Sequence, residues 1–342
     1  MDVRLSVLDQ SPIPEGLGGA DALRNSVDLA RRAEDLGYHR YWVAEHHGTP
    51  GLASASPEAL IGPIAAATER IRVGSGGVML PHYSPLKVAE TFSALSGLFP
   101  DRIDLGLGRA PGTDPMTTFA LQRDRREAAP DDFPQQLAEL LGYLNDDLPA
   151  DHPFARLTAT LPGRPERPQP WLLGSSEQSG IWAAEVGLPY AFADFINPYG
   201  AEIAARYRAQ AEGPVLAVAT WAICAETEEE AQRLASSSRM TMRLLGQGRL
   251  IAVPPVEKAL RFLASDVTPP SPRERRRRAV IGDPEQVRAG LESVAAEYGA
   301  DELMVVTITY DHEARRRSYE LIAEAFGLHP AGTEATAGTR RS

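Results

Sequence analysis

The sequence is poor in cysteine and has no long hydrophobic run. Only one of its 342 residues is a cysteine, Cys224, so no disulfide can form within the chain and no cysteine cluster can bind zinc. Cys224 lies in an apolar stretch, where a free thiol behaves as a small core residue. No apolar run of about 18 residues and no signal-like segment is present. These absences predict a cytoplasmic protein held together by its core.

Basic residues are also fewer than acidic residues. The chain has 35 Lys and Arg against 46 Asp and Glu, a formal net charge of -11. A chain this acidic is a poor candidate for binding nucleic acid without sequence preference. The run Arg275–Arg278 is short and typical of a solvated surface patch. Because 43% of the residues are hydrophobic, the chain can fill a large α/β core.

What the sequence does contain is a regular alternation of strand-like and helix-like segments. Eight strands are predicted, at residues 3–8, 40–44, 71–75, 103–107, 171–173, 190–193, 215–224 and 303–308. Helices are predicted between most of them; one begins at Asp283-Pro284 and ends at Gly299. Strands that alternate with helices predict a parallel (β/α)₈ barrel, the TIM barrel. An open doubly wound sheet is disfavoured, because Gly16–Gly19 lacks the glycine spacing of a dinucleotide fingerprint.

Three proline-rich or charged segments interrupt the alternation. Residues 111–134 and 147–170 predict insertions after the fourth strand, and 246–282 predicts an insertion before the eighth. A segment as long as the last one is usually a lid or a mobile loop. We therefore expect one barrel domain over residues 1–329, with a disordered tail at 330–342.

The second predicted strand ends in ionisable residues, Glu45, His46 and His47. Active sites of (β/α)₈ barrels lie at the carboxyl ends of the strands. A histidine there can act as an acid or base near neutral pH. Because neighbours in a strand point to opposite faces, only some of the three can face the barrel axis. A structural histidine and a metal ligand remain open, although the other histidines supply no obvious ligand set.

Three further strand ends are candidates for binding a flat or anionic ligand. Gly76 and Gly77 follow the third strand, where glycines let a ligand approach the backbone or simply form a tight turn. Arg109 follows the fourth strand and can grip a phosphate or form a surface ion pair. Ser175, Ser176 and Ser179 open a helix after the fifth strand, where an anion site or ordinary capping is possible. Arginine and serines on consecutive strands could share one phosphate.

Taken in order, these motifs resemble those of the luciferase-like flavin-dependent monooxygenases. They are EHH (45–47), VGSGGVMLPHYSP (73–85), GR (108–109), GSS (174–176) and VIGDPEQV (280–287). The resemblance covers roughly residues 3–326. Within the family, RAPGTD (109–114) is similar to a single-chain bacterial subgroup that includes tailoring oxygenases of aromatic polyketides, such as that of the mensacarcin pathway.

The resemblance implies a two-component monooxygenase that uses reduced FMN and O₂. A separate NAD(P)H:flavin reductase would supply FMNH₂, and oxygen would add to the flavin to give a C4a-peroxyflavin that oxidises a small organic substrate. His46 matches the catalytic histidine beside the flavin ring. Gly76 and Gly77 match the pair that relatives join by a cis peptide under the ring. Arg109 matches the phosphate arginine, and the three serines match the phosphate-binding turn. A homodimer is expected by the same analogy.

The sequence departs from the family pattern at two places. Gly108 stands where some relatives have a cysteine, and Asp194-Phe195 stands where the subgroup commonly has Ser-His. Three alternatives also stay open: an oxidoreductase that uses the deazaflavin F420, a non-catalytic flavin-binding protein, and a metal-dependent hydrolase that uses His46 and His47.

Overall fold

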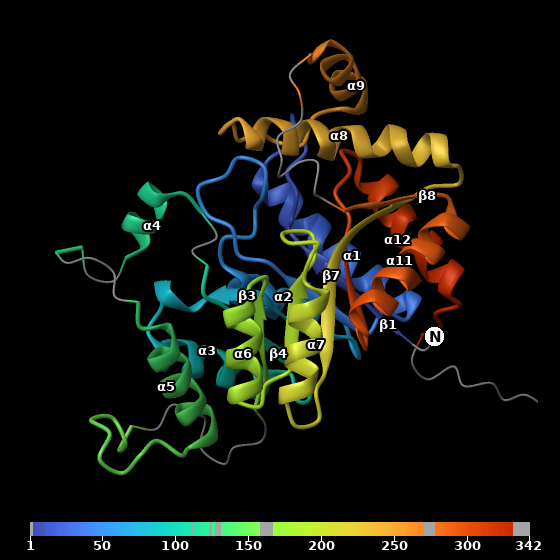
Figure 1. Cartoon of the computed structure of the whole chain (residues 1–342). Coiled ribbons are helices and arrows are strands. Elements are labelled where there is room, and N and C mark those ends of the chain that lie inside the picture. The colour runs from blue at the N-terminus through green and yellow to red at the C-terminus, as the bar shows by residue number, and fades with distance from the viewer. Residues whose placement is uncertain are drawn as a thin grey trace, which may run out of the picture.

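Eight parallel strands close into a barrel at the centre of the molecule (Figure 1). The computed structural model describes residues 3–110, 113–122, 125–126, 131–157, 167–267, 269 and 278–330. The strands are β1 (Arg4–Asp9), β2 (Arg40–Val43), β3 (Arg72–Met79), β4 (Ile103–Gly108), β5 (Gln169–Gly174), β6 (Tyr190–Ala193), β7 (Leu216–Cys224), β8 (Val280–Gly282) and β9 (Glu302–Val306). β1 to β7 pair in sequence order, and β9 closes the barrel between β7 and β1. The predicted TIM barrel is therefore confirmed.

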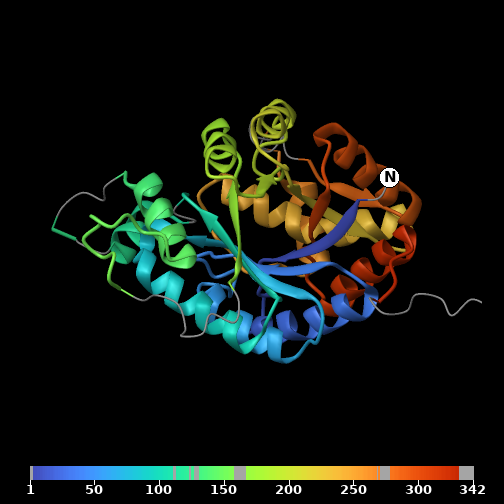
Figure 2. The same ribbon diagram turned by 90° about the horizontal axis from the view of Figure 1, so that it is seen from below.

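Helices surround the strands when the barrel is viewed from below (Figure 2). They are α1 (Gly19–Leu36), α2 (Pro57–Ala66), η1 (Leu80–His82), α3 (Pro85–Leu98), α4 (Pro115–Leu121), α5 (Phe133–Asn145), α6 (Glu177–Glu185), α7 (Ala201–Gln210), α8 (Glu228–Gly246), α9 (Val256–Ser265), α11 (Pro284–Tyr298) and α12 (His312–Phe326). Local signals fix their ends as predicted: the Asp283 carboxylate accepts from the Gln286 N–H at 2.9 Å, and Gly299 adopts a left-handed φ of 60°. None of these helices is long and apolar enough to cross a membrane in the part of the chain that is described.

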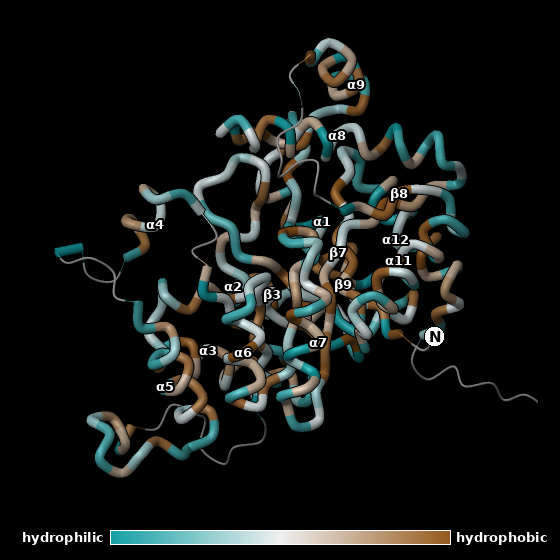
Figure 3. The backbone as a smooth tube through the Cα atoms, in the orientation of Figure 1, coloured by the Kyte–Doolittle hydropathy of each residue, from teal (hydrophilic) through white to brown (hydrophobic). Residues whose placement is uncertain are grey.

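The interior of the barrel is layered along its axis. On β1, Leu5 and Val7 pack outward against the helices, whereas Ser6 and Leu8 face inward. The middle layer is apolar and contains Leu8, Trp42, Trp171, Ala191, Ala217, Ala219, Met304 and Val306. The strands β7 and β9 accordingly appear hydrophobic in Figure 3. This layer separates the two ends of the barrel.

The amino-terminal end of the barrel is filled by a buried charged cluster. Arg40 donates to Asp104 at 2.9 Å and to Glu302 at 3.0 Å. Arg72 donates to the second oxygen of Asp104 at 2.6 Å, and Ser6 donates to Glu302 at 2.5 Å. Each of the two buried carboxylates thus meets a guanidinium, as a buried charge requires. The cluster joins β1, β2, β3, β4 and β9 at their starts.

The segment 246–282 differs from the predicted loop, because it contains α9 and the short strand β8. β8 pairs with the end of β7 beyond the barrel, so it is a ninth strand outside the closed ring. The Val253 N–H donates to the Ile13 carbonyl at 2.8 Å, which ties the segment to the loop after β1. Figure 1 shows α8 across the top of the barrel with α9 above it. The segment is therefore part of one end of the barrel.

The predicted positions of helices and strands were confirmed only in part. Three helices, α4, α7 and α9, were not predicted, and β3 runs four residues beyond its predicted end at Ser75. From the arginine run, only Arg278 lies within the described residues, where it pairs with Glu297 at 2.7 Å. The predicted tail lies outside the described residues from position 331 onward.

Candidate active site

A cavity of about 580 Å³ opens at the carboxyl ends of the strands. One wall comes from the strand ends and the loops that follow them, including Gln10, His46, Trp221 and Ile308. The facing wall comes from the end of α8 and the segment after it. Its members are Ser238, Thr241, Met242, Leu245, Gly246, Gly248, Arg249, Leu250, Ile251 and Val253. The lining is mostly apolar, which is typical of a site for a small organic molecule.

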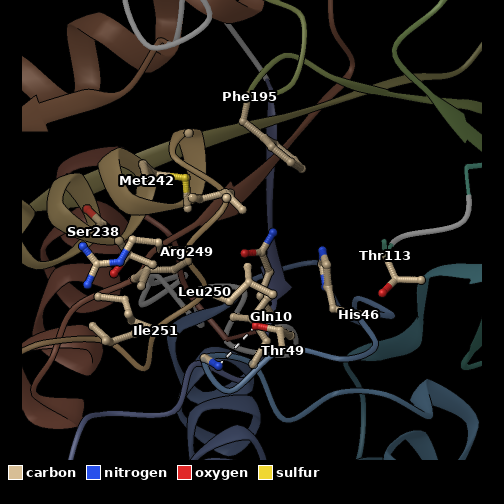
Figure 4. Close-up of a pocket in the computed structure, with 18 of the residues that line it drawn as sticks. Gln10, His46, Thr49, Thr113, Phe195, Ser238, Met242, Arg249, Leu250 and Ile251 are labelled. Carbon is tan, nitrogen blue, oxygen red and sulfur yellow. Dashed lines mark hydrogen bonds between the residues drawn. The ribbon is translucent and has the colours of Figure 1, made fainter. Parts of the chain in front are cut away.

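His46 projects into this cavity, with Phe195 and Met242 on other walls (Figure 4). Its backbone N–H donates to the Ser54 carbonyl at 2.9 Å, but its ring Nδ1 is buried without a hydrogen-bond partner. Burial, together with the neighbouring His47, lowers the pKa of His46 to about 4. The imidazole is therefore neutral at physiological pH, with a ring nitrogen that no protein group satisfies.

Glu45 and His47 hold the adjacent backbone. The fully buried Glu45 carboxylate lies 2.7 Å from His47 Nε2 and accepts from the Met79 N–H at 3.0 Å and the Tyr83 hydroxyl at 3.1 Å. It thus links the end of β2 to the end of β3. The metal-dependent alternative gains no support here: across the described residues, no group of three or more His, Cys, Asp or Glu side chains could hold a metal ion.

The peptide bond between Gly76 and Gly77 is cis, as the resemblance predicted. Both glycines are also required by packing within the barrel. A Cβ on Gly76 would meet Leu8 Cδ1 at 2.5 Å, and one on Gly77 would meet the Gly106 carbonyl oxygen at 2.8 Å. The sequence alone predicts that these glycines let a ligand approach or form a tight turn, and the structure adds that their neighbours leave no room for a side chain.

Arg109 lies against the helix that starts with the serines. Its guanidinium carbon is 5.5 Å from the centre of the Trp182 ring, and Trp182 is on α6. Arg109 forms no ion pair with any described residue and is exposed. The structure thus brings an available cation to the same helix whose first turn presents free N–H groups.

The three serines at the start of α6 have different surroundings. Ser176 is the N-cap, and its hydroxyl accepts from the Ser179 N–H at 3.4 Å. The Ser179 hydroxyl is buried and donates to the Ser176 carbonyl at 2.7 Å, so it serves the helix itself. Ser175 forms no side-chain hydrogen bond within the described residues and is half-buried. Ser175 and Ser176 are therefore better placed than Ser179 to meet a ligand directly.

Asp194 and Phe195, which depart from the family pattern, have different roles. Asp194 is fully buried and accepts from Tyr298 at 2.9 Å and Thr220 at 3.1 Å, so it is a structural group behind the site. Phe195 lines the cavity and stacks on Trp221, with ring centres 6.2 Å apart and planes 8° apart. An apolar ring therefore occupies the position where a second histidine was in question.

Sequence reasoning missed Gln10, which also lines the cavity. It is the first residue after β1 and continues the inward series of Ser6 and Leu8. The rule that singled out His46, a polar residue just beyond an apolar strand, applies equally to Gln10.

Comparison with known proteins agrees with this geometry. A family model described as luciferase-like monooxygenase matches residues 3–302. The chain belongs to the luciferase-like monooxygenase family. The resemblance drawn from the motifs is thereby confirmed, together with the coarse assignment to monooxygenases.

Members of this family resemble the chain over nearly its whole length. The uncharacterized protein YwcH of Bacillus subtilis is 47% identical over 95% of this chain and 99% of its own. The N-acetyl-S-alkylcysteine monooxygenase of the same organism is 38% identical over 94% of this chain and 98% of its own. The crystal structure of apo-MsnO8 has a TM-score of 0.87 and 42% identity, and the match covers 96% of this chain and 99% of that one.

Proposed function

We propose that this luciferase-like monooxygenase is the oxygenase component of a two-component system, which uses reduced FMN and O₂ to oxidise a small organic substrate. The observation that carries the proposal is the arrangement around one barrel mouth. An arginine that forms no ion pair with a described residue, a neutral histidine and an apolar cavity lie at the ends of β4, β5 and β2. Relatives with monooxygenase names support the same reading.

The residues at the mouth fit FMN at its phosphate end. Arg109 would grip the phosphate with parallel hydrogen bonds, and the first turn of α6, with Ser175 and Ser176, would add N–H and hydroxyl donors. Among the described residues Arg109 has no carboxylate partner that a phosphate would have to displace. Gly76 and Gly77 would then lie beneath the ring.

Bound reduced FMN would supply the reaction with O₂. The chain's own contribution is to position, to shield and to handle a proton. His46 stays neutral because burial opposes its protonation, so Nδ1 or Nε2 can take a proton from, or return one to, a group in the cavity. The apolar walls limit the access of water to that group.

Two partners complete the proposal. A separate NAD(P)H:flavin reductase would deliver FMNH₂, and the chain would act as a homodimer. Both follow from the family analogy.

The experiment that tests the proposal is anaerobic titration with FMNH₂, followed by stopped-flow mixing with oxygenated buffer. We expect binding, then a transient spectrum distinct from those of reduced and oxidised FMN. Preference for reduced F420, with no oxygen uptake, would replace the proposal by a hydride-transfer enzyme. Binding of FMN without oxygen chemistry would leave a flavin-binding protein.

The substrate is best approached with a probe set. N-acetyl-S-alkylcysteines come first, because a relative at 38% identity is named for their oxygenation. An aromatic polyketide substrate, implied by the subgroup resemblance, remains a prediction. Incorporation of ¹⁸O from ¹⁸O₂ into a product identifies the class that is turned over.

A further inference from the structure

Gln10 is a largely buried polar residue whose side chain has no partner among the described residues. Only 6% of the residue is exposed. Its backbone carbonyl accepts from the Ser54 hydroxyl at 3.3 Å, but its carboxamide forms no hydrogen bond with any described residue. The carboxamide atoms are not among the fully buried side-chain atoms that lack a partner, so they open onto the cavity. Because no described residue bonds to them, a molecule in the cavity can do so.

The carboxamide faces the cavity next to His46. Both side chains line the cavity, and Figure 4 shows them projecting into it from neighbouring strand ends. The Ala44 N–H donates to the Asp9 carbonyl at 2.9 Å, which keeps the chain after β1 beside the chain after β2. Gln10 lies two residues after Leu8, and His46 lies two residues after Ala44. Because Leu8 and Ala44 belong to the apolar interior, Gln10 and His46 continue the inward face of the chain.

The cavity around this pair is mostly apolar, although Asp114 and Arg249 also line it. Ile308, Val253 and Trp221 line the same cavity. At physiological pH neither Gln10 nor His46 carries a charge, since burial holds the pKa of His46 near 4. A charged group would find no counter-ion from these two side chains, whereas a neutral polar group would find a donor and an acceptor.

We propose that Gln10 is a specificity residue that docks an amide-like group of the substrate, an N–H beside a C=O, next to His46. The glutamine N–H donates to the substrate carbonyl, and the glutamine oxygen accepts from the substrate N–H. A primary amide or a lactam meets both requirements at once. The inference rests on the proposed function, because it takes the cavity as the substrate site.

The test uses two probes of the same shape, 3-phenylpropanamide and 4-phenylbutan-2-one, which differ by an NH₂ against a CH₃. Titration calorimetry is done on the purified full chain with and without FMN. The wild type is expected to bind the amide about tenfold more tightly than the ketone, and Gln10→Met to abolish that preference. Gln10→Met keeps the side-chain length and removes no protein hydrogen bond, so its thermal midpoint serves as the check on folding.

The matched control is Thr241→Val on the facing wall. The Thr241 hydroxyl already donates to the Ser237 carbonyl at 3.0 Å, so its removal should leave the preference unchanged. Equal affinity of the wild type for the two probes, or no binding of the amide, overturns the proposal. Loss of FMN affinity in Gln10→Met also overturns it, because Gln10 would then belong to the cofactor site. If the protein binds no FMN at all, the proposed function fails. The probe measurements without FMN then still test the role of Gln10 separately.

Discussion

The two ends of the barrel differ in how their central polar side chains are paired. At the amino-terminal end, Arg40, Asp104 and Glu302 are almost fully buried and bond to one another. At the carboxyl end, the Nδ1 atom of His46 is buried and the Gln10 carboxamide faces the cavity, and neither bonds to a described residue. Groups that are paired hold the strands in register, whereas groups left unpaired are available to a ligand. The pairing state thus separates the stabilising end from the reactive end.

The same contrast appears in protonation. Burial disfavours charge on Arg40, but the attraction of Asp104 and Glu302 outweighs it, so the pKa of Arg40 is raised. Burial disfavours charge on His46 as well, and no carboxylate opposes it, so the pKa of His46 falls. Similar burial therefore yields a fixed cation at one end and a neutral base at the other.

The largest effect should follow from breaking the paired end. Arg40→Met leaves Glu302 and one oxygen of Asp104 buried without their guanidinium, which should lower the free energy of unfolding by about 3–5 kcal/mol. Urea unfolding measures it. The control is Arg24→Met at an exposed pair with Asp21, where a far smaller loss is expected because solvent screens the pair. Equal losses in the two variants would contradict the comparison.

At the carboxyl end of the barrel, a substitution should change turnover and not folding. His46→Ala is expected to slow oxygenation of the substrate found by the probe set at least about a hundredfold, because the proton-handling group is gone. The affinity for FMNH₂ should change little. His329→Ala, at an exposed position remote from the cavity lining, is the control. Normal turnover by His46→Ala would remove His46 from the mechanism.

Arg109 sharpens the comparison at the carboxyl end, because it is a cation with no acidic partner among the described residues. Arg109→Met should weaken FMN binding by roughly tenfold to a hundredfold, the usual value of a charge-assisted hydrogen bond. Riboflavin, which lacks the phosphate, should bind both proteins alike, and fluorescence titration compares the two ligands. A parallel loss for riboflavin would mean that Arg109 contacts something other than the phosphate.

The smallest effect concerns pH. The native His46 has a pKa near 4, whereas an unfolded histidine titrates near 6.5, so the unfolded chain binds the extra proton as the pH falls below 6.5. Between pH 7.5 and 5.0 the wild type should lose about 2 kcal/mol more stability than His46→Gln. His39, whose pKa burial also lowers to about 4, is present in both proteins and cancels. Parallel stability curves would show that His46 is not held neutral by the fold.

Much of the fold could be predicted because the buried strands are continuous apolar runs and the main helices carry clear caps. Two of the three missed helices, α4 and α7, lack such signals. α4 has no buried residue, and α7 buries only Ala204 and Tyr207, so neither presents an apolar stripe. β3 was cut short because Gly76 and Gly77 are typical of a turn, yet in the barrel they lie within the strand, where neighbouring atoms leave no room for a Cβ.

The residues of the candidate site were also predicted only in part. His46 and Arg109 could be found because each follows an apolar strand and carries a recognisable chemistry. Gln10 satisfies the same positional rule but has no titratable group to attract notice. In the facing wall, residues 246–253 belong to the segment predicted as a lid, whereas nothing in residues 238–245 indicates that they approach the strand ends.

That facing wall has one more consequence. It belongs to the segment between β7 and β9, which is joined to the barrel by backbone contacts such as that of Val253 with Ile13 and by the buried Val253 side chain. Met242, Leu245 and Leu250 belong to no core cluster that the described residues share with the strands. Met242, Leu245 and Leu250 can therefore be exchanged for residues of other shapes while His46 and Arg109 keep their positions, so the same barrel could acquire new substrates by changing one half of a pocket and leaving its chemistry in place.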